Sequence, residues 1–145
     1  MREYQRILLA LELLPENDTL LIEKAQEVTT QEQSQLYLLH AVEHLSSFGV
    51  AYGVSAGVDV EEMLLEEARK TMSDLGNQLN IPEARQLVKV GPAKFVILEE
   101  AERLPADLIV VGSHGRHGVR LLLGSTANAI LHSAKCDVLA VRVQK

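Results

Sequence analysis

Segments with strand-like and helix-like patterns alternate along the 145-residue chain, and this order is the strongest constraint on its fold. The strand-like segments are short apolar runs, whereas the helical ones carry apolar residues three or four positions apart. Strands separated by helices are joined by crossover connections, which make neighbouring strands parallel. The sequence therefore predicts an α/β protein with an open, parallel, five-stranded sheet and helices on both faces. The expected strands are Ile7–Leu11, Leu36–Val42, Ala84–Val90, Asp107–Val111 and Asp137–Val143.

Helices are expected between these strands. Pro15 and the cluster Asn17–Thr19 are expected to break the first strand and to offer helix caps, and an apolar stripe of Leu20, Leu21 and Ala25 follows. The segment 46–57, SSFGVAYGVSAG, has turn residues without a period and is expected to be a surface loop. No internal repeat or linker interrupts the chain, so residues 1–145 are expected to form one domain. The later helices are expected at 60–79, Pro92–Arg103 and Ser125–Ser133, and the helix-compatible VRLLL leaves open an earlier start for the last one.

The segment Asp107–Thr126, DLIVVGSHGRHGVRLLLGST, places a strand directly before a glycine-rich loop and a helix start. Leu108–Val111 form an apolar run typical of a strand buried on both faces. Gly112 and Gly115 are expected to take positive φ and to let a ligand approach the backbone. Gly124–Thr126 would then present N–H groups and hydroxyls at a helix N-terminus, where the partial positive charge favours phosphate. Glycines after a strand also serve simply to turn the chain, so the residues alone leave phosphate binding open.

Composition and charge restrict the classes of partner. The net charge of −6 opposes binding to nucleic acid and to anionic membranes, because both would repel the chain. Cys136 is the single cysteine, so it is expected to be a small core residue in a reducing compartment. The N-terminus lacks the features of a signal peptide, and no apolar run approaches the ~18 residues of a membrane span. We therefore expect a cytoplasmic protein.

Four segments carry a resemblance to a known family: ILLALE, LYLLHAV, VGPAKFVILEEAERLPADLIVVGSHG and GSTANAILHSAKCDVLAV. They match, in order, the first strand, the second strand, the third-to-fourth-strand block and the last helix and strand of the universal stress protein family. The chain resembles this family over its whole length. The resemblance implies a flavodoxin-like, Rossmann-like sheet of strand order 3-2-1-4-5, with ligands outside the carboxyl ends of strands one and four. Open α/β sheets in general bind ligands at the same point, where the strand order reverses.

The resemblance also implies a nucleotide site. In the nucleotide-binding branch of the family, Ala10, Glu12 and Ala41 fall around the adenosine end. Arg116 is a candidate cation for a triphosphate, although exposed loop residues of this kind are also common. The residues that fall on or beside the phosphate loop are Val111, Gly112, Gly115, Gly124, Ser125 and Thr126.

Two departures from the family pattern bear on this site. The ATP signature of the family has nine residues between its second and third glycines, whereas eight separate Gly115 from Gly124. The acidic residue after the first strand is usually aspartate in the family, and Glu12 is one methylene longer. Some family members lack the glycine signature and are thought not to bind ATP, and this chain stands between the two groups.

The expected function is that of a stress-response protein that binds an adenine nucleotide, ATP or AMP, with Mg²⁺ accompanying the triphosphate, as a switch or sensor. We expect no enzyme, because the sequence shows neither a nucleophile and base set nor the lysine of a Walker loop, and His40 is expected to be a hydrogen-bonded core residue. Slow ATP hydrolysis is the least favoured alternative. The main alternative is a homodimer that binds no nucleotide and acts through protein contacts. The resemblance and the apolar strand Asp137–Val143, at a sheet edge, both predict a homodimer joined through that strand.

Overall fold

Five parallel strands form one sheet in the computed structural model, which describes residues 4–29, 34–43, 60–114 and 124–143. The strand order is β3-β2-β1-β4-β5, and every neighbouring pair is parallel, so the predicted sheet is confirmed. β1 lies between β2 and β4, which makes the carboxyl ends of β1 and β4 the point where the strand order reverses. The strands are β1 (Arg6–Ala10), β2 (Gln35–Val42), β3 (Gln86–Val90), β4 (Leu108–His114) and β5 (Asp137–Val143).

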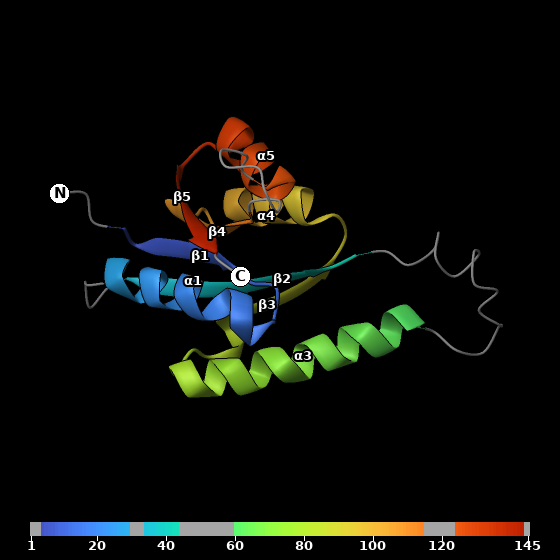
Figure 1. Cartoon of the computed structure of the whole chain (residues 1–145). Coiled ribbons are helices and arrows are strands. Elements are labelled where there is room, and N and C mark those ends of the chain that lie inside the picture. Colours follow the sequence, from blue (N-terminus) through green and yellow to red (C-terminus); the bar gives the residue numbers. More distant parts are fainter. Residues whose placement is uncertain (1–3, 30–33, 44–59, 115–123, 144–145) are drawn as a thin grey trace.

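Helices cover both faces of this sheet (Figure 1). On one face, α1 (Pro15–Val28) packs against β1, β4 and β5, and α3 (Val60–Leu79) packs against β2 and β3. On the other face lie α4 (Ala93–Arg103) and α5 (Ser125–Ser133), which also contact each other. In the part of the chain that the structure describes, no helix is long and apolar enough to cross a membrane.

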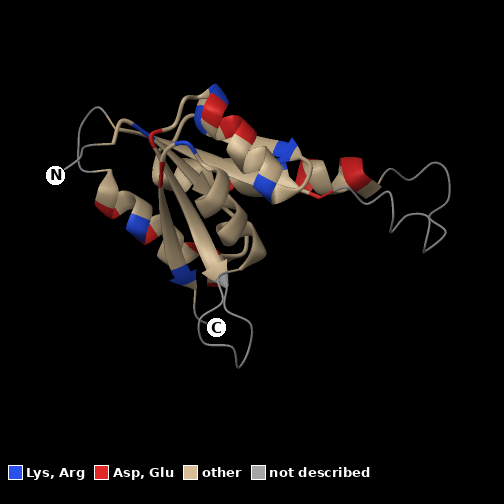
Figure 2. Ribbon diagram, turned by 90° about the horizontal axis from the view of Figure 1, so that it is seen from above, with Lys and Arg blue, Asp and Glu red and all other residues tan. Residues whose placement is uncertain are grey.

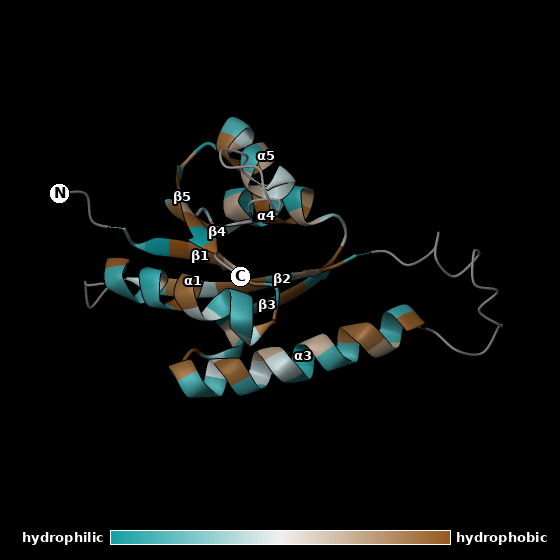
Figure 3. Cartoon of the chain, viewed as in Figure 1, coloured by the Kyte–Doolittle hydropathy of each residue, from teal (hydrophilic) through white to brown (hydrophobic). Residues whose placement is uncertain are grey.

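The alternation of side chains along each strand builds two separate cores. In β1, Ile7 and Leu9 point to the face of α1 and α3, whereas Leu8 points to the face of α4 and α5. Leu108–Val111 of β4 are buried on both faces, as their apolar run predicts. Figure 3 shows hydrophobic residues concentrated in the sheet, between the two helix layers, and hydrophilic ones on much of the helices.

Several element ends differ from the predictions, and β1 and β4 are among them, since β1 ends at Ala10 and β4 continues to His114. α1 begins at Pro15, where the fixed φ of proline suits the first helical position, so Asn17 and Asp18 lie inside the first turn and are not caps. β3 begins at Gln86, because Glu83–Arg85 form a turn of 3₁₀ helix. The predicted loop 46–57 lies outside the described residues.

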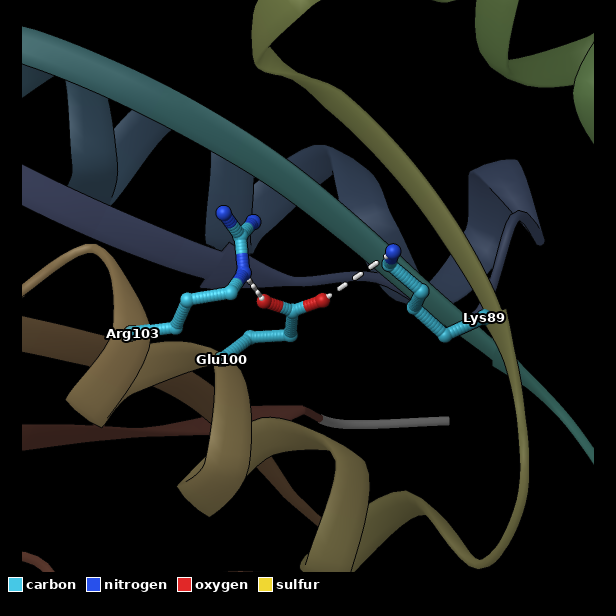
Figure 4. A network of polar contacts seen from close by, with 3 residues as sticks. All are labelled: Lys89, Glu100 and Arg103. Atoms are coloured by element: carbon cyan, nitrogen blue, oxygen red, sulfur yellow. Dashed lines mark hydrogen bonds and ion pairs between the residues drawn. The ribbon is translucent and has the colours of Figure 1, made fainter.

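Most charged residues in the described part of the chain lie on the helices (Figure 2). Among them, Glu100 of α4 and Asp18 of α1 are buried, and the Glu100 side chain is 7% exposed. One of its carboxylate oxygens lies 3.4 Å from Nζ of Lys89 on β3, and the other accepts a hydrogen bond from Nε of Arg103 (Figure 4). The contact with Lys89 joins α4 to the edge strand β3, whereas the contact with Arg103 lies within α4.

Candidate functional site

A cleft of about 260 Å³ opens at the carboxyl ends of β1 and β4. The turn between β1 and α1 forms one wall, and the first residues of α5 form another. The start of α4 and the end of β4 complete the lining. The described residues that line the cleft are Ala10, Leu11, Glu12, Asn17, Asp18, Leu21, Ala93, Ile97, Val111, Gly112, Gly124, Ser125, Thr126 and Ala127.

Carboxylate and amide groups organise the wall at the β1–α1 turn. The carboxylate of Asp18 accepts hydrogen bonds from the backbone N–H groups of Glu12, at 3.0 Å, and Leu14, at 3.2 Å. The amide nitrogen of Asn17 donates to the Glu12 carboxylate at 2.6 Å. Between these contacts, Leu13 takes a φ of 61°, a left-handed conformation that is costly for a bulky side chain. The hydrogen bonds on both sides of Leu13 hold this turn in place.

Burial sets the electrostatics of this wall. Asp18 is 4% exposed, and this desolvation raises the pKa of its carboxyl above 3.8. The hydrogen bonds from the backbone N–H groups oppose the rise, and the neighbouring Glu12 carboxylate adds to it. Asn17 is also buried, and its Oδ1 finds no hydrogen-bond partner among the described residues. This end of the cleft is therefore rich in hydrogen-bond acceptors.

The opposite wall offers hydrogen-bond donors. α5 begins at Ser125, with Gly124 as its N-cap in an extended conformation and no side-chain cap. The first described helical hydrogen bond runs from the N–H of Asn128 to the carbonyl of Gly124. The N–H groups of Ser125, Thr126 and Ala127 therefore have no partner within the helix, and the positive end of the helix dipole lies beside the cleft.

Gly112 plays a different part from the one the sequence predicts. β4 continues to His114, so Gly112 lies within a strand, and its φ is outside the positive range. A Cβ at this position would stand 3.2 Å from both Leu21 of α1 and Val143 of β5. Close packing of α1 on the sheet thus favours glycine at position 112, and the prediction of positive φ was wrong there.

The structure brings most of the predicted site residues together. Ala10, Glu12, Val111 and Gly112 line the cleft, as do Gly124, Ser125 and Thr126. Ala41 lies on β2 and packs into the core beneath α4 without lining the cleft. The positions Gly115 and Arg116 fall outside the described residues.

Sequence reasoning missed the polar residues of the first turn of α1. Asn17 and Asp18 were expected to be helix caps, yet they line the cleft and organise the turn. The signal available in the sequence was Pro15, which favours the first helical position and thereby places two polar residues on the inner side of the first turn. His40 is hydrogen-bonded as predicted, with its Nδ1 2.8 Å from the carbonyl oxygen of Leu11, but it is half-buried and not a core residue.

The raised pKa of Asp18 predicts a pH dependence of stability. The folded chain binds a proton at Asp18 more tightly than the unfolded chain does. The contribution of Asp18 to the free energy of unfolding therefore falls as the pH rises from 3.8 through the folded pKa. Asp18→Asn keeps the size of the side chain but lacks this titration and one of the two acceptor oxygens, and the loss of that oxygen does not itself vary with pH. The stability advantage of the parent over Asp18→Asn should therefore shrink as the pH rises, as measured by urea denaturation at a series of pH values. An advantage that grows with pH would contradict the raised pKa.

The sheet order defines an α/β protein of the flavodoxin-like type, and a cleft lies at its switch point. Residues 3–142 match the sequence profile of the universal stress protein family. The chain is 64% identical to universal stress protein A homolog 2 of Coxiella burnetii over 144 residues, which cover 99% of each chain. The chain belongs to the universal stress protein family.

Solved structures show the same fold. The universal stress protein UspA of Lactobacillus plantarum superposes with a TM-score of 0.72 and 21% identity, over 98% of this chain and all of that one. A universal stress protein in complex with cAMP superposes with a TM-score of 0.59 and 17% identity, over 99% of this chain and all of that one. At these identities the likeness supports the arrangement of the sheet and helices.

Proposed function

We propose that this chain binds an adenine nucleotide, ATP or AMP, in the cleft and acts as a cytoplasmic switch or sensor without catalytic turnover. The observation that carries this proposal is the opposite polarity of the two walls. N–H groups at the start of α5 offer donors to phosphate, and Mg²⁺ would accompany the triphosphate. Glu12 and its neighbours offer acceptors to the hydroxyl and amino groups of a nucleoside.

The cleft also offers apolar surface to a nucleotide. Its volume of about 260 Å³ lies just below the range of about 300–1,000 Å³ that is usual for small-molecule sites. Ile97, Val111 and Ala127 supply apolar surface between the two polar walls. A family member with the same fold binds cAMP, which joins an adenosine to a phosphate as ATP and AMP do.

Nucleotide retained during purification tests the proposal directly. The parent protein, purified without added nucleotide, should carry adenine nucleotide detectable by absorbance and mass spectrometry. Calorimetry should then show binding of ATP or AMP to the stripped protein. No binding at millimolar concentrations would contradict the proposal and favour action through protein contacts alone.

The alternative function is supported by the exposed edge of the sheet. β5 pairs only with β4 among the described strands, and its apolar residues Val138, Leu139 and Ala140 are half-buried. A half-buried apolar edge favours addition of a strand from a second copy. A homodimer of this kind is also compatible with nucleotide binding, so we propose it alongside the cleft.

Leu139→Lys should convert such a dimer to a monomer. In the dimer, the ammonium group of the new lysine would have to be buried at the two-fold axis. In the monomer, the lysine stem can lie along the apolar surface with its amine in water. Light scattering at tens of micromolar would show the change in mass. Leu131→Lys, at an exposed position on α5, is the matched control and should leave the mass unchanged. A parent that is already monomeric would contradict the dimer.

A further inference from the structure

A second cavity, outside the nucleotide cleft, lies between α1 and α3. Its volume is about 390 Å³. The two helices lie on the same face of the sheet (Figure 1), and each packs against different strands, α1 on β1, β4 and β5 and α3 on β2 and β3. The cavity, called the α1–α3 groove below, is lined by Leu13, Pro15, Asp18, Thr19, Ile22, Glu23, Thr71, Asp74, Leu75, Gln78 and Leu79.

Two helical stripes face each other across the α1–α3 groove. The lining positions recur every three or four residues on both helices, which is the spacing of a single helix face. Each stripe combines apolar residues with a carboxylate. Leu13, Leu75 and Leu79 pack against the core beneath, so the floor of the groove is apolar.

The charge of the α1–α3 groove is entirely negative. Asp18, Glu23 and Asp74 line it, and no lysine or arginine does so among the described residues. Glu23 and Asp74 are exposed and make no ion pair with any residue that the structure describes. Two unpaired carboxylates therefore stand on opposite walls above an apolar floor.

We infer that the α1–α3 groove docks a basic amphipathic helix of a partner protein. An apolar floor between two helices accepts the apolar stripe of a third helix, and carboxylates on both walls match lysine or arginine beside that stripe. A second copy of this chain is a poorer occupant, because its net charge of −6 repels the groove. The chain segment 44–59 contains no lysine or arginine, so it lacks the cations that the walls would bind.

The α1–α3 groove shares structural parts with the nucleotide cleft, and this link rests on the proposed function. Asp18 lines both cavities. Glu12 lines the cleft and the next residue, Leu13, lines the groove, while the Asp18 carboxylate bonds the backbone on both sides of Leu13. A ligand that contacts Glu12 therefore acts on the turn that shapes the groove. Binding in the two cavities is coupled, and each ligand changes the affinity of the other by the same factor.

A labelled model peptide tests the docking surface without a known partner. The probe is a fluorescein-labelled helix of about 14 residues, roughly four turns, made only of leucine and lysine with the leucines at helical spacing. Fluorescence anisotropy should show binding to the parent protein. Glu23→Lys with Asp74→Lys should weaken binding by about tenfold or more, because both walls become repulsive.

The controls separate the groove from net charge. Glu66→Lys with Glu99→Lys makes the same change in charge at exposed positions that lie off the groove-facing stripes, and it should leave the affinity within about twofold at physiological salt, because exposed distant charges are screened. A peptide with glutamate in place of lysine should not bind. NMR shifts caused by the leucine–lysine peptide should cluster at Ile22, Thr71 and Leu75. Equal losses in both double variants, shifts elsewhere, or no binding by the parent would overturn the docking surface.

The coupling is tested by repeating the titration with saturating AMP. We expect the peptide affinity of the parent to change by about fivefold or more, and to change much less in Asp18→Asn, which lacks one of the acceptor oxygens at the turn. If the parent binds both ligands independently, the coupling is wrong while the nucleotide site stands. If the parent binds the peptide and no AMP, the proposed function and the coupling both fail, and the docking surface stands.

Discussion

Loss of both cations beside Glu100 is expected to reduce the free energy of unfolding by about 2–4 kcal/mol at neutral pH. The Glu100 side chain is 7% exposed in the parent, and Lys89→Ala with Arg103→Ala removes the two cationic partners that the structure gives its carboxylate. An unpaired buried charge is strongly destabilising. We expect less than the full effect of a deeply buried pair, because the side chains of Lys89 and Arg103 are 48% and 56% exposed and water reaches them. Urea denaturation measures the change.

A third substitution distinguishes this mechanism from a general loss of packing. Adding Glu100→Leu to the double variant removes the unpaired charge and should restore most of the lost stability. Glu100→Leu in the parent should cost little, because the two cations that remain can be solvated by water. If the triple variant is no more stable than the double variant, the buried charge is not the cause.

Gly112→Val is expected to weaken nucleotide binding by at least tenfold, or about 1.4 kcal/mol. The added Cβ would already stand 3.2 Å from Leu21 and Val143, and the two further methyl groups of valine need more room than these side chains leave. Overpacking of this kind costs about 1–3 kcal/mol of stability and displaces α1 from the sheet. Gly112 and Leu21 both line the cleft, so the displacement changes the ligand site as well as the core. Calorimetry with AMP and urea denaturation measure the two effects.

The matched control is a glycine far from the cleft. Gly76 lies in α3, where an added Cβ would meet the flexible amide end of Gln86. Gly76→Ala would displace this amide and its hydrogen bond to the carbonyl of Ile81, at 2.8 Å, while gaining about 0.5–1 kcal/mol of helix propensity. Its stability should stay near that of the parent and its nucleotide affinity should be unchanged. Unaltered affinity in a folded Gly112→Val protein would show that the ligand binds elsewhere.

Features that depend on local pattern were predictable from the sequence. The bounds of α3, α5 and β5 agree with the prediction, because each follows the period of its own apolar residues, and glycine or proline stands near the ends of the two helices. The buried strand Leu108–Val111 was predictable for the same reason. The strand order came from the family resemblance, and the position of the cleft followed from that order.

Only the tertiary structure decided the roles that depend on distant residues. Gly112 reads locally as a loop glycine, but its partners, Leu21 and Val143, come from a helix and a strand far along the chain. Asp18 reads as a cap, yet the way α1 packs beside the end of β1 buries it between two cavities. The sequence by itself determined the order of elements, because strand and helix periods are local. Which polar groups are buried together, and which helix faces stay open, was decided by packing between segments that no local pattern relates.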